Sequence, residues 1–487
     1  MRFQNMNVPY SATFSAKDAA LDGLHAMAEA EAKHNLWDFA GRRVLVEGGG
    51  YQKIWLETQP MGGAMYALRD MRAAVNNQLL FMEYRRADGR IPGSIACLDG
   101  KLVPQFNKFQ GFCFPDPALD VAYIAGADRE YLCLLYETLR GFDEYLWRVR
   151  DSDGDGLLES WCVCDTGEDR ALRYGDAPMW WTEEAPPSEF RRVPMPSMDV
   201  TAYSFTARST LSALSRLLEN GNEDLWRRKA EDVRARVRAG FWDDARGAYF
   251  DRFKDGTRDP ALIHNTLRLM YWGVPDADMA GRFVREHLLN PNEFWTPMPL
   301  PSVAANDPLF RNEPTNCWTG QPEGLTYQRA VRALENYGFL PELTRIGRKL
   351  LSAAWEGRAF SQQYDPFTGA PSLPEEVTQD VNGNEVVRRR SSYGPTILAV
   401  MEYVAFLYGI RVGRNRLTWG ALGDRGESEY RVEWGGRVYV LQNGSENAAY
   451  VDGQKKFVIP RGFRAVSDLA GERVRFERID PDQEERQ

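Results

Sequence analysis

The feature that most constrains the fold of this chain is a long series of amphipathic segments that come in neighbouring pairs. Apolar residues follow helical spacing in stretches near 17–34, 62–85, 128–149, 200–219, 222–240, 260–272, 276–289, 321–336, 340–356 and 391–410. One stripe ends at Leu218, a turn rich in Gly and Asn follows at 219–223, and a new stripe starts at Leu225. Because such a turn stops one helix before the next begins, the pattern predicts antiparallel helical hairpins.

Long irregular connections rich in Gly, Pro and Trp separate the helix pairs. About ten to twelve helices joined in this way indicate a barrel of helical hairpins whose loops gather at one end. An α-solenoid is the alternative, but the chain shows no fixed repeat period. We therefore predict a mainly α domain over residues 1–410.

From about Arg411 the spacing of apolar residues changes from helical to alternating. Short alternating segments occur at 430–434, 437–441, 456–459 and 474–478, and turns with glycine separate them. The sequence predicts a small β-domain over residues 411–487 that ends in a charged tail.

Charge and hydropathy narrow the function classes. The net charge is −9 and basic residues are interspersed with acidic ones, so no basic stripe is available for nucleic acid. No run of about 18 apolar residues predicts a membrane span. The first ten residues lack the apolar core of a secretory signal, so we expect a cytoplasmic protein unless a leader is missing.

The sequence gives little indication of metal sites or disulfide bonds. The six cysteines lack paired zinc spacing and the four histidines lie far apart, so we expect reduced, mostly buried thiols and no metal or cofactor. The segment Asp151–Glu159 begins like a calcium loop, but Cys162 stands where the bidentate glutamate of such a loop belongs. A rigid turn is the favoured interpretation, and a calcium site is the alternative.

The turn at 165–169 is the strongest chemical signal. It places carboxylates around Gly167, and Trp161, Tyr174, Trp180 and Trp181 lie close to it in the sequence. A carboxyl group among aromatic rings is partly desolvated, which raises its pKa and lets it hold a proton near neutral pH. This is the property of a general acid in sugar hydrolysis.

A family resemblance rests on the helix pairs and on three motifs in order along the chain, Arg150–Leu157, Thr166–Asp169 and Asn316–Gly320. These features resemble the six-hairpin glycosidases of glycoside hydrolase family 63 and the related mannosylglycerate and glucosylglycerate hydrolases, and more distantly trehalase. The resemblance spans most of residues 50–410. It implies an (α/α)6 six-hairpin barrel and an inverting enzyme with two carboxyl groups roughly 6.5 to 9.5 Å apart.

The resemblance assigns the general acid to Asp169, the last residue of its turn. The segment Phe360–Gly369 looks like the part of the family that carries the base, but the family's glutamate falls on Gln362, and a neutral amide cannot take a proton from water. Three explanations stay open. Gln362 is an engineered replacement of glutamate, or a natural base lies elsewhere, or the motif is misaligned or the relative inactive. The candidates for a base elsewhere are Glu323, Asp365 and Glu57.

The resemblance and the aromatic residues near the turn also give a set of candidate substrate-binding residues. They are Trp55, Glu57, Gln110, Trp161, Arg173, Tyr174, Trp318, Glu323 and Tyr364. Trp55 either stacks on a sugar ring or belongs to the core, and Gln110 either donates to a hydroxyl or lies in a plain polar loop. Glu323 is a base or a favourable first-turn carboxylate of a helix. Thr319 replaces a family arginine, so a glycerate-linked substrate is not assumed.

The polar segment 365–390 is unusually long for a loop, and we expect it to wall the cleft. Its end, Arg388–Arg390, is expected to form a solvated or salt-bridged surface patch.

We predict an inverting, exo-acting glycoside hydrolase that acts on a small oligosaccharide or glycoside, with an α-glycoside as the favoured substrate. A catalytically silent carbohydrate-binding protein is one alternative. A sugar epimerase or lyase on the same barrel is another, although such enzymes commonly use histidine or tyrosine and the histidines here are scattered. The expected partner is a small carbohydrate, with no nucleic acid and no membrane; the sequence does not indicate the oligomeric state.

Overall fold

The computed structural model describes residues 1–481 except 316, 373–374 and 380–384. Within these residues it has twelve α-helices in two sets. The inner set is α2 (Gln59–Tyr66), α4 (Pro115–Ala125), α6 (Met198–Leu218), α8 (Asn265–Trp272), α10 (Gly324–Glu335) and α12 (Gly394–Tyr408). The outer set is α1 (Ala19–His34), α3 (Met71–Glu83), α5 (Arg129–Val149), α7 (Glu223–Phe241), α9 (Ala277–Phe283), which the π-helix Val284–Leu288 continues, and α11 (Leu340–Gly357).

The inner helices form a closed ring. Each even-numbered helix contacts the next one, and α12 contacts α2 to complete the circle. Outer helices pack on the ring, as α3 does on α2, α7 on α6 and α11 on α10. The structure is therefore mainly helical, as the hairpin pattern predicted.

Sequence composition explains which helices lie inside. Every residue of α8 is buried, and in α12 all residues except Glu402 are buried. By contrast α7 buries only one stripe, which includes Trp226, Ala230 and Val233, and exposes its charged face. An all-apolar helix needs neighbours on every side, whereas an amphipathic one needs a single covered face.

Two helical expectations need correction. The stretch 62–85 is two helices instead of one, because the chain turns after Tyr66 and Asp70 caps α3 by accepting from the Ala73 amide at 2.9 Å. Helix α4 was not expected, since its sequence starts with Pro115 and Pro117. Proline suits the first turn of a helix, where its missing N–H would have had no partner.

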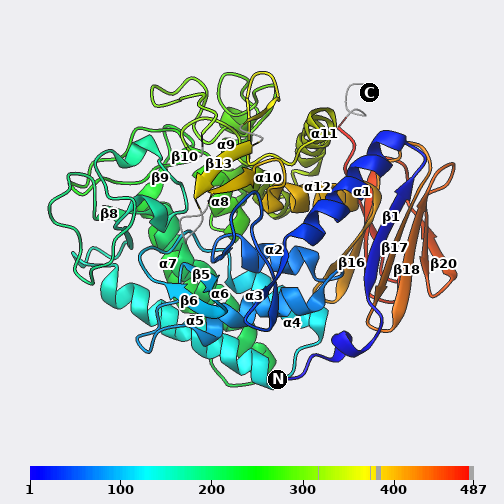
Figure 1. Cartoon of the computed structure of the whole chain (residues 1–487), viewed down its shortest axis with the longest axis horizontal. Coiled ribbons are helices and arrows are strands. Elements are labelled where there is room, and N and C mark those ends of the chain that lie inside the picture. The colour runs from blue at the N-terminus through cyan, green and yellow to red at the C-terminus, as the bar shows by residue number, and fades with distance from the viewer. Residues whose placement is uncertain (316, 373–374, 380–384, 482–487) are drawn as a thin grey trace.

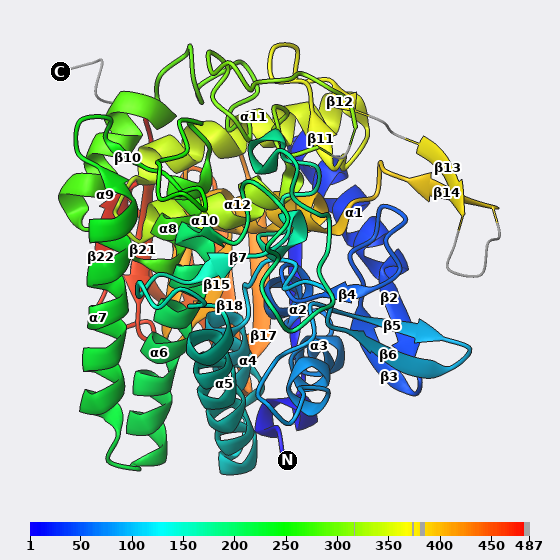
Figure 2. The same cartoon turned by 90° about the vertical axis from the view of Figure 1, so that its left-hand side faces the viewer.

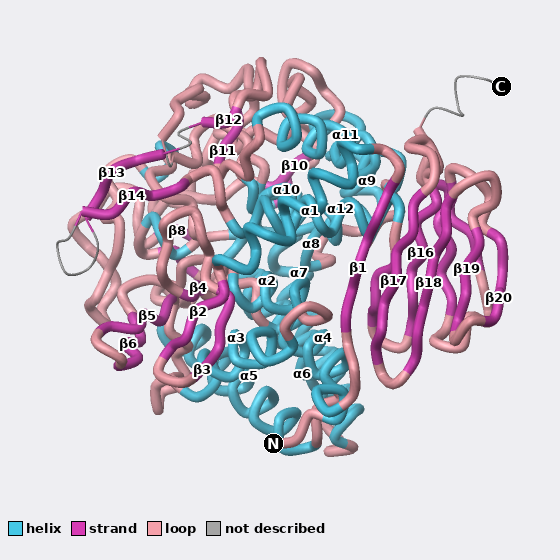
Figure 3. Tube along the Cα trace, turned by 45° about the vertical axis from the view of Figure 1, so that its right-hand side comes forward, coloured by secondary structure: helices cyan, strands magenta, loops and turns pink. Residues whose placement is uncertain are grey.

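The connections around the ring are unequal. The chain from α5 to α6 spans residues 150–197, whereas the chain from α6 to α7 spans only 219–222. Long connections likewise precede α8, α10 and α12, so the N-terminal ends of the inner helices carry most of the loops (Figure 3). Short antiparallel strand pairs lie within these connections and nearby. They are β2 (Leu36–Phe39) with β3 (Arg42–Leu45), β4 (Ile54–Trp55) with β5 (Ser94–Leu98) and β6 (Lys101–Gln105), β7 (Glu159–Ser160) with β8 (Met195–Pro196), β9 (Trp242–Asp243) with β10 (Ala248–Tyr249), β11 (Gln363–Tyr364) with β12 (Pro371–Ser372), and β13 (Glu375–Gln379) with β14 (Glu385–Arg389). Figure 2 shows β13 and β14 at the outer edge of the molecule.

The predicted C-terminal strands are confirmed, and they form two antiparallel sheets. One sheet has the order β1 (Ser11–Ala16), β17 (Ser428–Trp434), β18 (Arg437–Asn443), β19 (Ala448–Val451) and β20 (Gln454–Val458). The other has the order β15 (Ile410–Gly413), β16 (Arg416–Ala421), β21 (Phe463–Ser467) and β22 (Arg475–Arg478).

The N-terminal strand joins the C-terminal sheet. Figure 1 shows β1 beside β17, and the register pairs Ser11 with Glu433 and Ala16 with Ser428. The two parts also share one apolar core, in which Phe406 of α12 and Trp419 of β16 are both buried. We keep the boundary between residues 410 and 411 as a proposal for where the helical domain ends. Among the described helices, none combines the length and apolar character needed to span a membrane.

Candidate active site

The loops at the N-terminal ends of the inner helices are tied to one another by backbone hydrogen bonds. The Gln110 amide, before α4, donates to the Cys164 carbonyl, before α6, at 2.8 Å. The Trp318 amide, before α10, donates to the Asp169 carbonyl at 3.1 Å. The Gly324 amide at the start of α10 donates to the Gln362 carbonyl, before α12, at 2.8 Å. These bonds bring most of the predicted site residues to one end of the ring.

The turn that carries Asp169 rests on Asp165, which is fully buried. Its carboxylate accepts from the Arg150 guanidinium at 2.6 Å and from the Trp161 and Phe109 amides at 2.9 and 3.0 Å. Burial favours the neutral acid, but the charge of Arg150 and these hydrogen bonds outweigh it and hold the pKa of Asp165 below its ordinary value. The ionised carboxylate of Asp165 therefore supports the predicted turn from within the core.

Glu168 forms a second buried anchor of the same turn. Arg173 pairs with it and also with Asp251, and Asn265 donates to it at 3.1 Å. Burial alone would raise the pKa of Glu168, but the charges of Arg173 and Arg268 lower it well below the ordinary value. Arg173, which we predicted to bind substrate, thus serves in a buried ion-pair network.

Asp169 itself is half-buried at the mouth of the ring. Its Oδ1 accepts from the Cys164 thiol at 3.1 Å and lies 3.5 Å from Nε2 of Gln110. Gln110 is held in the left-handed region at φ +58°, and the neighbouring Gly111 at +71°. The predicted acid and the predicted donor Gln110 are therefore side by side.

Glu57 packs against the back of this turn. A Cβ on Gly167, which has φ +75°, would lie 2.3 Å from Oε2 of Glu57, so only glycine fits there. Oε1 of Glu57 accepts from Arg329 at 2.6 Å and lies 3.8 Å from Arg268. Burial raises the pKa of Glu57 to about 7, and the two arginines oppose that rise.

Gln362 lies on the opposite side of the ring, before α12. Its amide oxygen accepts from the Tyr51 hydroxyl and from Arg390, both at 3.0 Å. Arg390 is only 5% exposed, so its predicted place in a surface patch is wrong, whereas Arg389 is exposed as predicted. The side chain of Arg388 lies outside the described residues. Arg390 faces inward because the buried amide and hydroxyl oxygens offer it partners.

Glu323 is the residue directly before α10 and is 0% exposed. The predicted capping interaction is absent, because its side chain makes no bond to the first turn of the helix. Burial and the charge of Asp169 raise its pKa well above the ordinary glutamate value, while Gln363 and Arg390 favour the charged form. Asp365, another base candidate, caps the turn to Thr368 and accepts from Asn312 at 2.8 Å.

The predicted aromatic residues fall into two groups. Trp318 and Trp55 lie by the loops that meet at Asp169: Trp318 stacks on His264 with ring centroids 5.6 Å apart, and Lys108 and Lys53 lie 5.0 and 5.2 Å from the Trp55 ring. Trp161, Tyr174 and Tyr364 lie in the core. Trp161 packs on Arg150 and donates to Glu159, Tyr174 bonds to Thr166 and Ser160, and the Tyr364 hydroxyl accepts from the Ser361 amide. Trp180 is 54% exposed and Trp181 donates to the Ala185 carbonyl, so the described contacts of these two residues do not include Asp169.

Sequence reasoning missed several residues of this region. Arg268 of α8 and Arg329 of α10 approach Glu57, and Arg268 also donates to the Thr166 carbonyl at 2.7 Å. A signal was available, since each arginine interrupts an apolar helical stripe that becomes fully buried. Tyr51 and Arg390 had no such signal, because they come from loops.

The Asp151–Glu159 segment is a turn in which the carboxylates bond to the loop itself. Asp151, Asp153 and Asp155 come close together, and each accepts a backbone amide of the same loop. Glu159 turns away and bonds to Ser152 and Trp161. One ligand oxygen from each of the three aspartates lies within 4.8 Å of the others, so the rigid turn and the calcium site both remain open interpretations.

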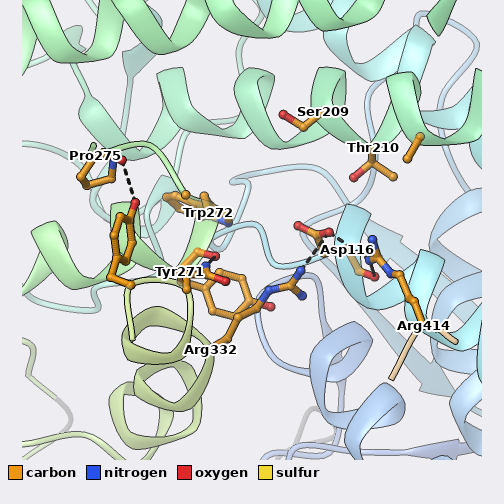
Figure 4. A pocket seen from close by; sticks show the side chains of 12 residues that line it. Asp116, Ser209, Thr210, Tyr271, Trp272, Pro275, Arg332 and Arg414 are labelled. Atoms are coloured by element: carbon orange, nitrogen blue, oxygen red, sulfur yellow. Dashed lines mark hydrogen bonds and ion pairs between the residues drawn. The ribbon is translucent and has the colours of Figure 1, made fainter. Parts of the chain in front are cut away.

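A separate cavity of about 440 Å³ lies at the C-terminal ends of α8 and α10, away from Asp169. Figure 4 shows Asp116 between Arg332 and Arg414 at its wall, and both ion pairs are 3.0 Å long. These charges pair with one another, so this wall of the cavity joins the ring to the turn between β15 and β16.

Several solved structures share this architecture. The chain is similar to a GH63 mannosylglycerate hydrolase from Thermus thermophilus in complex with glucose, with 18% identity and a TM-score of 0.61 over 78% of this chain and 99% of that one. It is also similar to an α-L-rhamnosidase from Dictyoglumus thermophilum (12% identity, TM-score 0.58, 91% of this chain and 44% of that one). A third similar structure is the neutral trehalase Nth1 from Saccharomyces cerevisiae (13%, 0.53, 77% and 79%).

These structural similarities show a shared fold, and a match of the sequence to a family model shows the family. The family model of the mannosylglycerate hydrolase MGH1-like glycoside hydrolase domain matches residues 61–381. That range contains the Asp169 turn and the Gln362 segment, and it confirms the resemblance on which the site was predicted. The chain therefore belongs to the mannosylglycerate hydrolase MGH1-like glycoside hydrolases.

Proposed function

We propose that this chain is an inverting, exo-acting glycoside hydrolase of small oligosaccharides or glycosides, with α-glycosides preferred. We also interpret the closed ring of six inner helices as the (α/α)6 barrel of this class. The observation that carries the proposal is the position of Asp169, where the loops before α4, α6 and α10 are tied together. Family membership supports the reaction class.

Asp169 is proposed as the general acid. Gln110 and Cys164 hold its Oδ1, and the buried anchors Asp165 and Glu168 fix the turn on which it stands. A fixed carboxylic acid can give its proton to the glycosidic oxygen as the bond to the sugar breaks. The leaving alcohol then departs without a negative charge.

The depth of the site supports cleavage at a chain end. Glu57, Trp318 and Gln362 are each less than 5% exposed, so the residues behind Asp169 close the site from below. An exo-acting hydrolase needs a closed side behind its acid, because a polymer would otherwise continue through the site. Glu57, with Arg268 and Arg329 behind it, is proposed to accept hydrogen bonds from sugar hydroxyls.

The test is hydrolysis of 2,4-dinitrophenyl, 4-nitrophenyl and phenyl α-glycosides of common hexoses, together with α-linked disaccharides. Asp169→Asn should lower kcat/KM for the phenyl glycosides and disaccharides by about 10²- to 10⁴-fold. The loss should shrink for the dinitrophenyl compounds, because that leaving group needs no proton.

Asp176→Asn is the matched control, since Asp176 is exposed and caps the Arg191 amide at 3.0 Å. It should keep the wild-type dependence on the leaving group. If the wild type binds sugars but releases none from any member of the panel, the chain is a silent carbohydrate-binding protein and the proposal is wrong.

A further inference from the structure

Glu323 is a buried carboxyl group that the fold does not use. It is 0% exposed, and no hydrogen bond of ordinary geometry reaches either of its carboxyl oxygens from the described residues; Gln363 is the neighbouring polar side chain that favours its charged form. Burying a carboxyl group without hydrogen bonds costs free energy, and the cost is far larger for the charged form. A carboxyl group buried in this way lowers the stability of the fold, which points to a role in catalysis.

The backbone pairs Glu323 with Gln363, the residue that follows the base position of the family. Residues 323 and 363 form an antiparallel bridge, and the Gly324 amide donates to the Gln362 carbonyl at 2.8 Å. Paired residues of adjacent antiparallel segments have Cα atoms about 4.5–5.5 Å apart. Glu323 therefore enters the site from the segment adjacent to the one that carries Gln362.

Glu323 also shares its surroundings with Asp169. The charges of Asp169 and Glu57 both act on the Glu323 carboxyl group and, after burial, are among the causes that raise its pKa. The loop of Glu323 reaches Asp169 directly, since the Trp318 amide donates to the Asp169 carbonyl at 3.1 Å. Two carboxyl groups thus face one region from two different loops.

Gln362 is fixed in a different role. Its amide oxygen already accepts from the Tyr51 hydroxyl and from Arg390. An amide has no site that takes a proton from water near neutral pH. The Gln362 side chain therefore positions Tyr51 and Arg390 and leaves the water to another group.

We propose that Glu323 is the general base of this chain, in place of the residue at position 362; this rests on the proposed hydrolase function. A water oxygen forms a bond to the anomeric carbon while Glu323 takes one proton of that water. The bond from the anomeric carbon to the glycosidic oxygen breaks, and that oxygen takes the Asp169 proton. Glu323 ends protonated and Asp169 ionised, and proton exchange with solvent restores the pair.

The reaction needs one proton on the pair. Asp169 and Glu57 disfavour the charged form of Glu323, whereas Arg390 and Gln363 favour it, so an ionised Glu323 is a strong base toward water. Turnover should follow the singly protonated pair, with loss of activity when a second proton binds or when the last one leaves. A bell-shaped pH profile of kcat/KM is the expected readout.

The experiment compares Glu323→Ala and Glu323→Gln with Asp169→Ala on α-glycosyl fluorides, whose fluoride leaves without an acid. Both Glu323 variants should lose about 10²- to 10⁴-fold in kcat, whereas Asp169→Ala should keep most of its turnover. Sodium azide, a nucleophile that needs no base, should restore turnover of Glu323→Ala and give the β-glycosyl azide. Glu323→Gln keeps the side-chain shape and covers the case in which the alanine variant does not fold.

Glu335→Gln is the control, because Glu335 lies at the other end of α10 and pairs with Arg411 and Arg464. It should keep turnover within the same decade. Full activity of both Glu323 variants, or azide rescue of Asp169→Ala instead, overturns the assignment. If the wild type hydrolyses nothing, the hydrolase function itself fails and the base assignment fails with it.

Discussion

The buried pair of Asp165 and Arg150 gives a quantitative test of how the Asp169 turn is held. The two side chains are 0% and 1% exposed, and the carboxylate accepts three hydrogen bonds on its two oxygens. Asp165→Asn keeps the shape, but it removes the charge and offers a single oxygen to donors that approach both sides. The Arg150 guanidinium is then left buried without a counter-charge.

Removing one partner of a buried ion pair costs about 3–5 kcal/mol in the free energy of unfolding. We expect this loss for Asp165→Asn and a similar one for Arg150→Met, measured by urea unfolding followed through tryptophan fluorescence. In the double variant the losses should not add, and the coupling should reach about 1–3 kcal/mol.

The control is Glu137→Gln, which breaks the exposed pair with Arg140 (49% and 43% exposed). It should change stability by less than about 0.5 kcal/mol. If Asp165→Asn costs no more than this control, or if the two single losses add in the double variant, the turn does not depend on the buried pair and the reasoning is refuted.

Two further predictions concern the same turn. Gly167→Ala should abolish activity and lower stability, because its Cβ would lie 2.3 Å from Oε2 of Glu57; Gly154→Ala, at φ +76° with nothing within 4 Å, should cost only about 1–2 kcal/mol and keep activity. Glu168 has a pKa lowered by Arg173 and Arg268 against the effect of burial, so its contribution to stability is present above the ordinary glutamate pKa and is lost as pH falls toward the lowered value. Glu168→Gln should therefore flatten the fall of unfolding free energy below about pH 4.3, and an unchanged acid limb in the variant would contradict the ion-pair network.

Much of the fold follows from patterns within short stretches of sequence. Apolar spacing is local, so helices such as 128–149 and 340–356 and the C-terminal strands lie close to their predicted positions. Helix α4 was missed because the two prolines of its first turn were not weighed as a helix start. The pairing of β1 with β17 joins residues more than 400 apart, and no local pattern contains that information.

Residues of the candidate site were predictable only where they belong to a recognisable sequence motif. The position of Asp169 followed from its turn, and the doubt about Gln362 followed from an amide in place of a glutamate. The partners of Gln362 were not predictable, since Tyr51 lies 311 residues away in the chain and Arg390 reaches it across the long segment before α12. Likewise, an isolated glutamate such as Glu323 looks in sequence like an ordinary helix-start residue, and only its complete burial in the structure distinguishes it.

The measurement that tests the central claim most directly is the anomeric configuration of the first sugar released, followed by ¹H NMR during hydrolysis of an active aryl α-glycoside. Water that attacks from the side opposite Asp169 gives the β-anomer first, and the α-anomer grows only as the sugar mutarotates. We predict that order for the wild type. Initial release of the α-anomer would contradict direct displacement by water between two carboxyl groups.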